Sequence, residues 1–132
     1  MTGSTSDVDG AVGTSVDARE RLTASRTGAA VLRRVRSEVR KLGGAEERAT
    51  TSQVAFRRRR GFAYLWVPGQ YVASDVPVVI SLALPTHVRS SRFKEVVQPS
   101  VGVWMHHLEV RKVGELDAEF REWLERAYQG AA

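Results

Sequence analysis

The sequence contains no cysteine, which excludes disulfide bonds, thiolate metal sites and cysteine nucleophiles from its 132 residues. No apolar run approaches the roughly 18 residues of a membrane span. The longest, from Val76 to Leu84, is interrupted by a proline and a serine. The amino end carries neither a basic segment nor an apolar segment of the secretory type. We therefore expect a cytoplasmic protein that does not enter the membrane.

Recognisable catalytic patterns are also missing. The glycines form no phosphate-binding loop, and the serines form no nucleophile elbow. Only three histidines are present, at positions 87, 106 and 107, and carboxylates from positions that the sequence does not predict would have to complete a metal site. We assign no catalytic residue, metal site or cofactor, and expect a non-enzymatic domain.

The composition is that of an ordinary globular domain, with 42% hydrophobic and 27% charged residues. Residues 1–17 are mostly Gly, Ser, Thr, Asp and Val without periodicity, and we expect a disordered tail because they offer little apolar surface. Residues 18–129 form a chain long enough for a single domain, and 130–132 complete the C-terminal end.

Positive charge is concentrated in one part of the chain. Thirteen of the twenty basic residues lie between positions 19 and 60, against four glutamates. Such asymmetry is typical of surfaces that bind nucleic acid or other anions. Only three of the twenty basic residues are lysines, so a general compositional preference for arginine is the alternative explanation.

Two helices are predicted from apolar residues that recur at helical spacing. The first runs from residue 27 or 28 to 42, ends at Gly43 and Gly44, and follows an ambiguous segment, residues 18–28. The second begins near Glu115, where acidic residues oppose the helix dipole. Its apolar stripe is Leu116, Phe120, Trp123, Leu124 and Ala127.

The best-specified element is a β-hairpin over residues 53–68, which read QVAFRRRRGFAYLWVP. Val54 and Phe56 share one face of its first strand, and Phe62, Tyr64 and Trp66 share one face of the second, which alternation predicts to be buried. Further strands are expected at residues 78–84, 92–97 and 103–110, and residues 45–51 are expected to be a polar connection.

These elements predict an α+β fold. An antiparallel sheet of about five strands is flanked by an N-terminal and a C-terminal helix packed on one face, while the other face stays partly open. The predicted core joins six aromatic residues to six aliphatic ones: Phe56, Phe62, Trp66, Trp104, Phe120, Trp123, Val35, Val39, Ile80, Leu82, Leu108 and Leu124.

Four motifs in order carry a family resemblance. They are the hairpin with Phe62 and Ala63, the pair Arg92 and Phe93, the run His106-His107-Leu108, and the segment GELDAEFREWLERAY that ends at Tyr128. Over residues 28–129 the chain resembles the bacterial domain-of-unknown-function family DUF5655. The resemblance implies an α+β domain, often attached to small modules such as a zinc ribbon, and it carries over no catalytic residue. This chain has a low-complexity tail and no zinc ribbon.

The adjacent His106 and His107 must point to opposite faces of a strand, so they cannot chelate one ion together. If Leu108 faces the core, His106 and Trp104 share its face, and His107 lies on the other. We interpret His106 as a structural, hydrogen-bonded histidine. The alternative is a small-molecule pocket between sheet and helices near His106, His107 and Trp104. It would serve either binding alone or catalysis, with His107 as a general base or an anion contact.

The arginines Arg57, Arg58, Arg59 and Arg60 lie where the hairpin turns. They form either a solvated turn that discourages edge association or a contact for phosphates, with aromatic side chains nearby for stacking. Arg36 and Arg40 of the first helix would add to the phosphate-contacting surface in the second interpretation. We therefore expect a binding or accessory domain that contacts nucleic acid or another polyanion through the basic hairpin, or that binds a protein partner.

Overall fold

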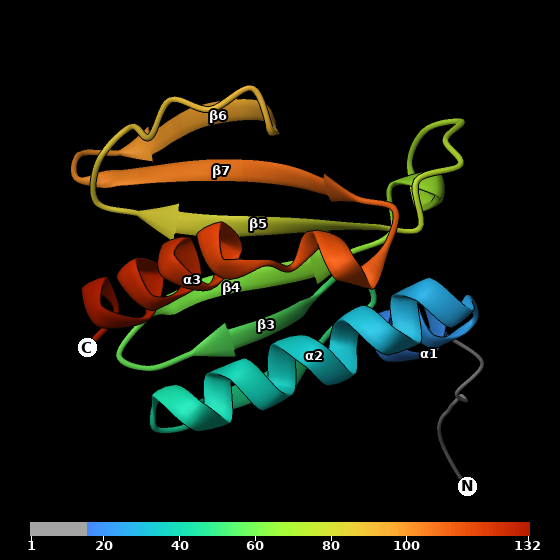
Figure 1. Ribbon diagram of the computed structural model, residues 1–132. Helices are drawn as coiled ribbons and strands as arrows, with labels where there is room; N and C mark the ends of the chain where they lie inside the picture. The colour runs from blue at the N-terminus through green and yellow to red at the C-terminus, as the bar shows by residue number, and fades with distance from the viewer. Residues whose placement is uncertain (1–15) are drawn as a thin grey trace, which may run out of the picture.

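The backbone is organised by a six-stranded antiparallel sheet, and this computed structural model describes residues 16–132 of the chain. The strand order is β2-β3-β4-β5-β7-β6, so β7 lies between β5 and the edge strand β6 (Figure 1). The strands are β2 (Glu46–Ala49), β3 (Val54–Arg57), β4 (Gly61–Trp66), β5 (Val78–Leu84), β6 (Phe93–Ser100) and β7 (Val103–Val110). Short connections join most of the neighbours, as expected of a meander.

The helices are α1 (Ala18–Thr23), α2 (Arg26–Leu42) and α3 (Ala118–Gly130), with 3-10 turns η1 (Pro68–Gln70) and η2 (Val113–Glu115). Asp17, Ser25 and Asp117 cap the three helices, each accepting a hydrogen bond from a backbone N–H of the first turn. Gly43 ends α2 with φ of 131°, a conformation that side chains disfavour. The predicted helix boundaries at both ends of the chain are thus close to the observed ones.

All three helices cover one face of the sheet (Figure 1). The covered face carries side chains from four strands: Val54, Phe56, Ala63, Leu65, Ile80, Leu82, His106, Leu108 and Val110. Facing them are the helix residues Leu22, Val31, Leu32, Val35, Val39, Phe120, Trp123, Leu124, Ala127 and Tyr128. The predicted fold class, α+β with an antiparallel sheet and helices at both ends, is confirmed.

The strand count is six rather than five because residues 46–49 form β2 and not a polar connection. This strand reads EERA, and its side chains alternate between exposed and half-buried positions. It pairs with β3 through its backbone and lies at the edge of the sheet, where polar side chains are tolerated. Its sequence therefore has no hydrophobic alternation by which it could be recognised.

The prediction that Tyr64 and Trp66 lie on the buried face of the second hairpin strand was wrong. In the register of β3 and β4, Phe56 pairs with Ala63 but Arg57 pairs with Gly61, so Phe62 is an extra residue at a bulge. The bulge reverses the alternation beyond it. Phe62 and Leu65 are both in the core, while the side chains after the bulge that were expected inside, Tyr64 and Trp66, lie on the open face.

Two of the expected core residues are only partly buried: Trp66, which the bulge directs to the open face, and Trp104 of β7. The other ten are buried. The expected tail covers residues 1–15, which lie outside the described part of the chain, and Val16 and Asp17, which lead into α1. Across residues 16–132, no helix is both long enough and apolar enough to cross a membrane.

Candidate functional site

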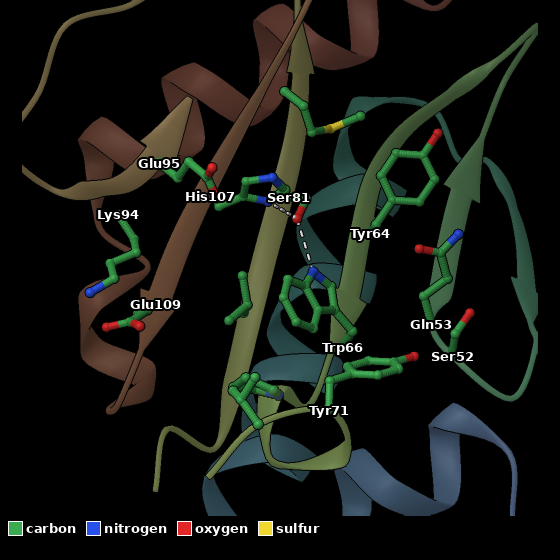
Figure 2. A pocket seen from close by; sticks show the side chains of 14 residues that line it. Ser52, Gln53, Tyr64, Trp66, Tyr71, Ser81, Lys94, Glu95, His107 and Glu109 are labelled. Atoms are coloured by element: carbon green, nitrogen blue, oxygen red, sulfur yellow. Dashed lines mark hydrogen bonds between the residues drawn. The ribbon is translucent and has the colours of Figure 1, made fainter. Parts of the chain in front are cut away.

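The face of the sheet that the helices leave uncovered holds a broad hollow of about 890 Å³. Figure 2 views this face, with the helices behind the strands. The central floor is built by alternate residues of β4, β5 and β7, namely Tyr64, Trp66, Val79, Ser81, Met105, His107 and Glu109. Ser52, Gln53, Pro68, Tyr71, Val72, Lys94 and Glu95 complete the lining.

The strand register brings these side chains together. Tyr64 pairs with Ser81, and Ser81 pairs with His107, so three residues on three strands stand in one row across the floor. Glu95 on the edge strand β6 extends the row, because it pairs with His107. Side chains of paired residues in neighbouring strands point to the same face, so the row is a direct result of the register.

A chain of hydrogen bonds crosses the floor of the hollow. The Trp66 indole N–H donates to the Ser81 hydroxyl oxygen at 2.9 Å, and that oxygen lies 2.6 Å from Nδ1 of His107. The indole and imidazole rings also meet edge to face, with centroids 6.2 Å apart. Three side chains from β4, β5 and β7 are thus held in one arrangement, which gives the floor a fixed geometry.

Burial lowers the pKa of His107, and the negative charge of Glu95 opposes that shift only in part. A lowered pKa keeps the imidazole neutral at neutral pH. His107 is therefore a hydrogen-bonding group in the hollow and not a positive charge.

The loop that follows β4 forms one wall of the hollow. Pro68 begins the 3-10 turn η1, and Tyr71 follows it with its ring 6.2 Å from the Trp66 indole, again edge to face. Tyr71 is 56% exposed and Val72 is 62% exposed, so two adjacent side chains of the loop present apolar surface to water. This wall is apolar and faces water.

The opposite wall carries charge. Lys94, Glu95 and Glu109 stand along β6 and β7, across the floor from Trp66 and Tyr71 (Figure 2). None of the three forms an ion pair with another residue of the described chain. Two carboxylates and one ammonium give this wall a net negative charge within a basic protein.

The predicted histidine geometry is confirmed: His106 faces the core with Leu108, and His107 faces the hollow with Met105 and Glu109. His106 is fully buried between the backbone N–H of Val88, which donates to its Nε2 at 3.0 Å, and the carbonyl of Trp104, 2.9 Å from its Nδ1.

Aromatic rings fill the space beside His106, where the alternative pocket was expected. The ring centroids of Phe93 and His106 are 4.8 Å apart. His87 stacks on Trp104, with ring centroids 4.9 Å apart. Burial, the leading cause, lowers the pKa of His106. His106 and Trp104 therefore face away from the hollow, and of the three pocket candidates only His107 lines it.

The arginine turn lies against the C-terminal end of α3. Arg58 donates to the carbonyl of Tyr128 at 3.0 Å, and its guanidinium carbon lies 4.0 Å from the centre of that ring. Arg60 donates to the carbonyl of Gly130 at 2.9 Å. These cations meet the partial negative charge of a helix C-terminus, which is a stabilising arrangement.

The other arginines of the predicted anion site are dispersed. Arg57 lies 3.9 Å from Glu46 of β2, and the side chain of Arg59 is exposed without a polar partner among the described residues. Arg36 donates two hydrogen bonds to Glu47, at 2.8 and 2.7 Å, and these lower the pKa of that carboxyl. Arg40 is exposed in the last turn of α2.

The sequence did not reveal the role of Ser81. It lies in an apolar strand, VVISLAL, whose inward face is filled by Ile80 and Leu82. The alternation around Ser81 was a usable signal, because a lone hydroxyl in such a strand faces away from the core. In the part of the chain that the structure describes, no group of three acidic or histidine side chains is placed to hold a metal ion.

A family model described as "Domain of unknown function (DUF5655)" matches residues 21–131, nearly the whole chain. No curated protein and no solved structure matches the sequence.

Proposed function

The chain belongs to the DUF5655 family, and we propose that it is a binding protein whose site for a small organic molecule is the hollow on the open face of the sheet. The hollow falls in the volume range of small-molecule sites, about 300–1,000 Å³. Its lining combines a mainly apolar surface with a few polar groups, which is the usual composition of such sites. The proposed site lies around His107, and not beside His106 between sheet and helices, where the alternative pocket was expected from the sequence.

The observation that carries the proposal is the aromatic corner formed by Trp66 and Tyr71. Two large rings meet edge to face at the side of the hollow, and both remain accessible to water. Exposed apolar surface of this kind costs free energy in the free protein, at about 25 cal/mol per Å². A flat ligand that covers the corner would recover that free energy, and patches of this type mark binding sites.

Binding is favoured over catalysis by the state of Ser81. The residue is 2% exposed, and its hydroxyl oxygen already contacts both Trp66 and His107. A nucleophile must reach a substrate carbon, and this hydroxyl is held in the floor. No carboxylate forms a hydrogen bond with His107 in the described chain, so the third group of a catalytic triad is not in place.

The test is a ligand-observed NMR screen of monocyclic and bicyclic aromatic fragments against the whole protein. Trp66→Ala should abolish the saturation-transfer signal of fragments that bind. Trp104→Ala is the matched control, because it removes another half-buried indole that lies outside the hollow. If no fragment binds, or if binding survives Trp66→Ala, the hollow is not a ligand site.

A second candidate function is polyanion binding by the arginine turn. It is favoured by the exposure of Arg58, Arg59 and Arg60 side by side, with Arg57 beside them. Two of the four guanidinium groups already contact the carbonyls of α3. Each guanidinium has five N–H donors, so the contacts with these carbonyls leave donors free, and phosphate binding is compatible with the packing of the turn against α3.

The appropriate test is fluorescence anisotropy with single- and double-stranded oligonucleotides at two salt concentrations. Arg59→Ala should weaken binding and lower the salt slope by about 0.9 for each duplex phosphate that the variant no longer neutralises. This substitution is preferable to Arg58→Ala because the Arg59 side chain, unlike that of Arg58, forms no hydrogen bond with α3 among the described residues. An unchanged affinity at low salt, or no binding at all, would remove this function.

A further inference from the structure

The protonation state of His107 can be derived from its neighbours, and this inference rests on the proposed ligand-binding function. The Trp66 indole nitrogen can only donate a hydrogen bond. The Ser81 oxygen is its acceptor at 2.9 Å. The Ser81 hydroxyl still has one proton to donate, and in the described chain the only acceptor within hydrogen-bond distance is Nδ1 of His107, at 2.6 Å.

A hydroxyl that donates to Nδ1 requires that nitrogen to be unprotonated. Neutral imidazole has one proton, so His107 carries it on Nε2. The relay from Trp66 through Ser81 thus selects one of the two tautomers.

The Nε2–H donor of His107 has no acceptor in the described chain. The ring is half-buried. Nε2 has no hydrogen-bond partner among residues 16–132, yet it is not fully buried, so the donor is reachable from the hollow. His107 lies at the centre of the floor, between the aromatic side chains and the charged wall (Figure 2). An N–H group in this position is suited to recognising an acceptor on a bound molecule.

The charge of the surroundings decides what kind of acceptor fits. Glu95 and Glu109 line the same wall, with Lys94 as its only cation. A carboxylate or phosphate oxygen would meet net repulsion there, whereas an unprotonated ring nitrogen would not. The aromatic corner of Trp66 and Tyr71 in turn favours a flat ring system over an aliphatic one.

We propose that the hollow selects a neutral bicyclic nitrogen heteroaromatic compound, whose ring nitrogen accepts a hydrogen bond from Nε2–H of His107 while its rings cover the aromatic corner. His107 is the residue that determines specificity. Ser81 is a positioning residue, since it acts only by fixing the tautomer and the orientation of the imidazole.

The test compares benzimidazole with indole, two bicyclic probes of the same shape that differ in one acceptor nitrogen. Each is titrated against the whole protein at pH 7.5, where benzimidazole is neutral. Benzimidazole should bind about three- to tenfold more tightly, the usual contribution of one neutral hydrogen bond. His107→Phe should abolish this preference while both probes still bind, and Met105→Leu, which changes an apolar residue of the same floor, should preserve it.

A second measurement does not depend on any ligand. Long-range ¹H–¹⁵N correlation spectra of the imidazole should show His107 protonated at Nε2 and unprotonated at Nδ1. In Ser81→Ala the spectrum should change to a mixture of tautomers, and the preference for benzimidazole should shrink. A purely structural role for Ser81 would change the stability but not the tautomer.

The outcomes distinguish the selection of the ligand by His107 from the binding of a ligand in the hollow. Equal binding of the two probes, or a His107 protonated at Nδ1, overturns the selection by His107 and leaves the hollow as a binding site. If neither probe binds, both proposals fail. Preference for benzimidazole that depends on His107 and Ser81 supports the inference.

Discussion

Replacing Arg58 by alanine should destabilise the fold, although its side chain is exposed. The guanidinium donates to the Tyr128 carbonyl at 3.0 Å and lies over the Tyr128 ring at 4.0 Å. Tyr128 itself is buried, and its hydroxyl donates to the carbonyl of Gly44 at 2.8 Å. Arg58 therefore supports the point where the hairpin, the end of α3 and the end of α2 meet.

The magnitude follows from two contacts. A cation over an aromatic ring contributes about 0.5–1 kcal/mol at an exposed site. A cation at a helix C-terminus contributes about 0.3–1 kcal/mol there, and solvent keeps both values near their lower ends. We expect Arg58→Ala to lower the free energy of unfolding by about 0.8–1 kcal/mol, which corresponds to a melting temperature lower by about 3–4 °C in a domain of this size.

Arg59→Ala is the matched control. It removes the same side chain from the neighbouring position, and the backbone N–H of Arg59, which donates to the carbonyl of Ala131 at 2.8 Å, is retained. Its effect should stay within about 0.5 kcal/mol. Urea denaturation followed by circular dichroism measures both variants. Equal effects of the two substitutions would refute the reasoning that the turn caps α3.

Three further predictions concern stability. Trp123→Ala removes a ring that is 4% exposed, and should cost about 3–5 kcal/mol; an unchanged urea midpoint would contradict its place in the core. Because burial lowers the pKa of His106, the unfolded chain binds a proton at higher pH than the folded one, so the free energy of unfolding should be level above about pH 6.5 and fall below it. The urea midpoint at pH 5.5 should then lie below that at pH 7.5, by less in His106→Gln, and a midpoint that rises on acidification would oppose this. Removal of residues 1–15 should leave the melting temperature unchanged because their composition offers little to a core, whereas removal of 1–17 also deletes the cap at Asp17 and should cost about 1 kcal/mol; equal melting temperatures of the two shortened chains would contradict the role of the cap.

The sequence predicted β5 and β7 with the bounds that the structure shows, at Val78–Leu84 and Val103–Val110. Both are inner strands with a strongly apolar face against the helices, so their alternation is clear. The edge strand β2 was missed because only its backbone is needed for pairing. Patterns of hydrophobicity indicate which residues are buried, so they do not identify an edge strand whose side chains are polar.

The candidate site was less predictable because a single extra residue decides it. Without the bulge at Phe62, the alternation of β4 would direct Tyr64 and Trp66 toward the helices. A bulge depends on strand register, which joins residues on different strands and cannot be read from one strand alone. The opposite directions of His106 and His107 needed only the local geometry of one strand, and they were predicted.

The position of α3 also affects how the sheet is covered during synthesis. This helix packs on β4 and β5, in the middle of the sheet, yet it follows all six strands in the sequence. Until residues 118–130 have left the ribosome, the apolar side of the central strands β4 and β5 lacks part of its cover. A nascent chain that stalls before α3 would expose this surface and be a substrate for chaperones.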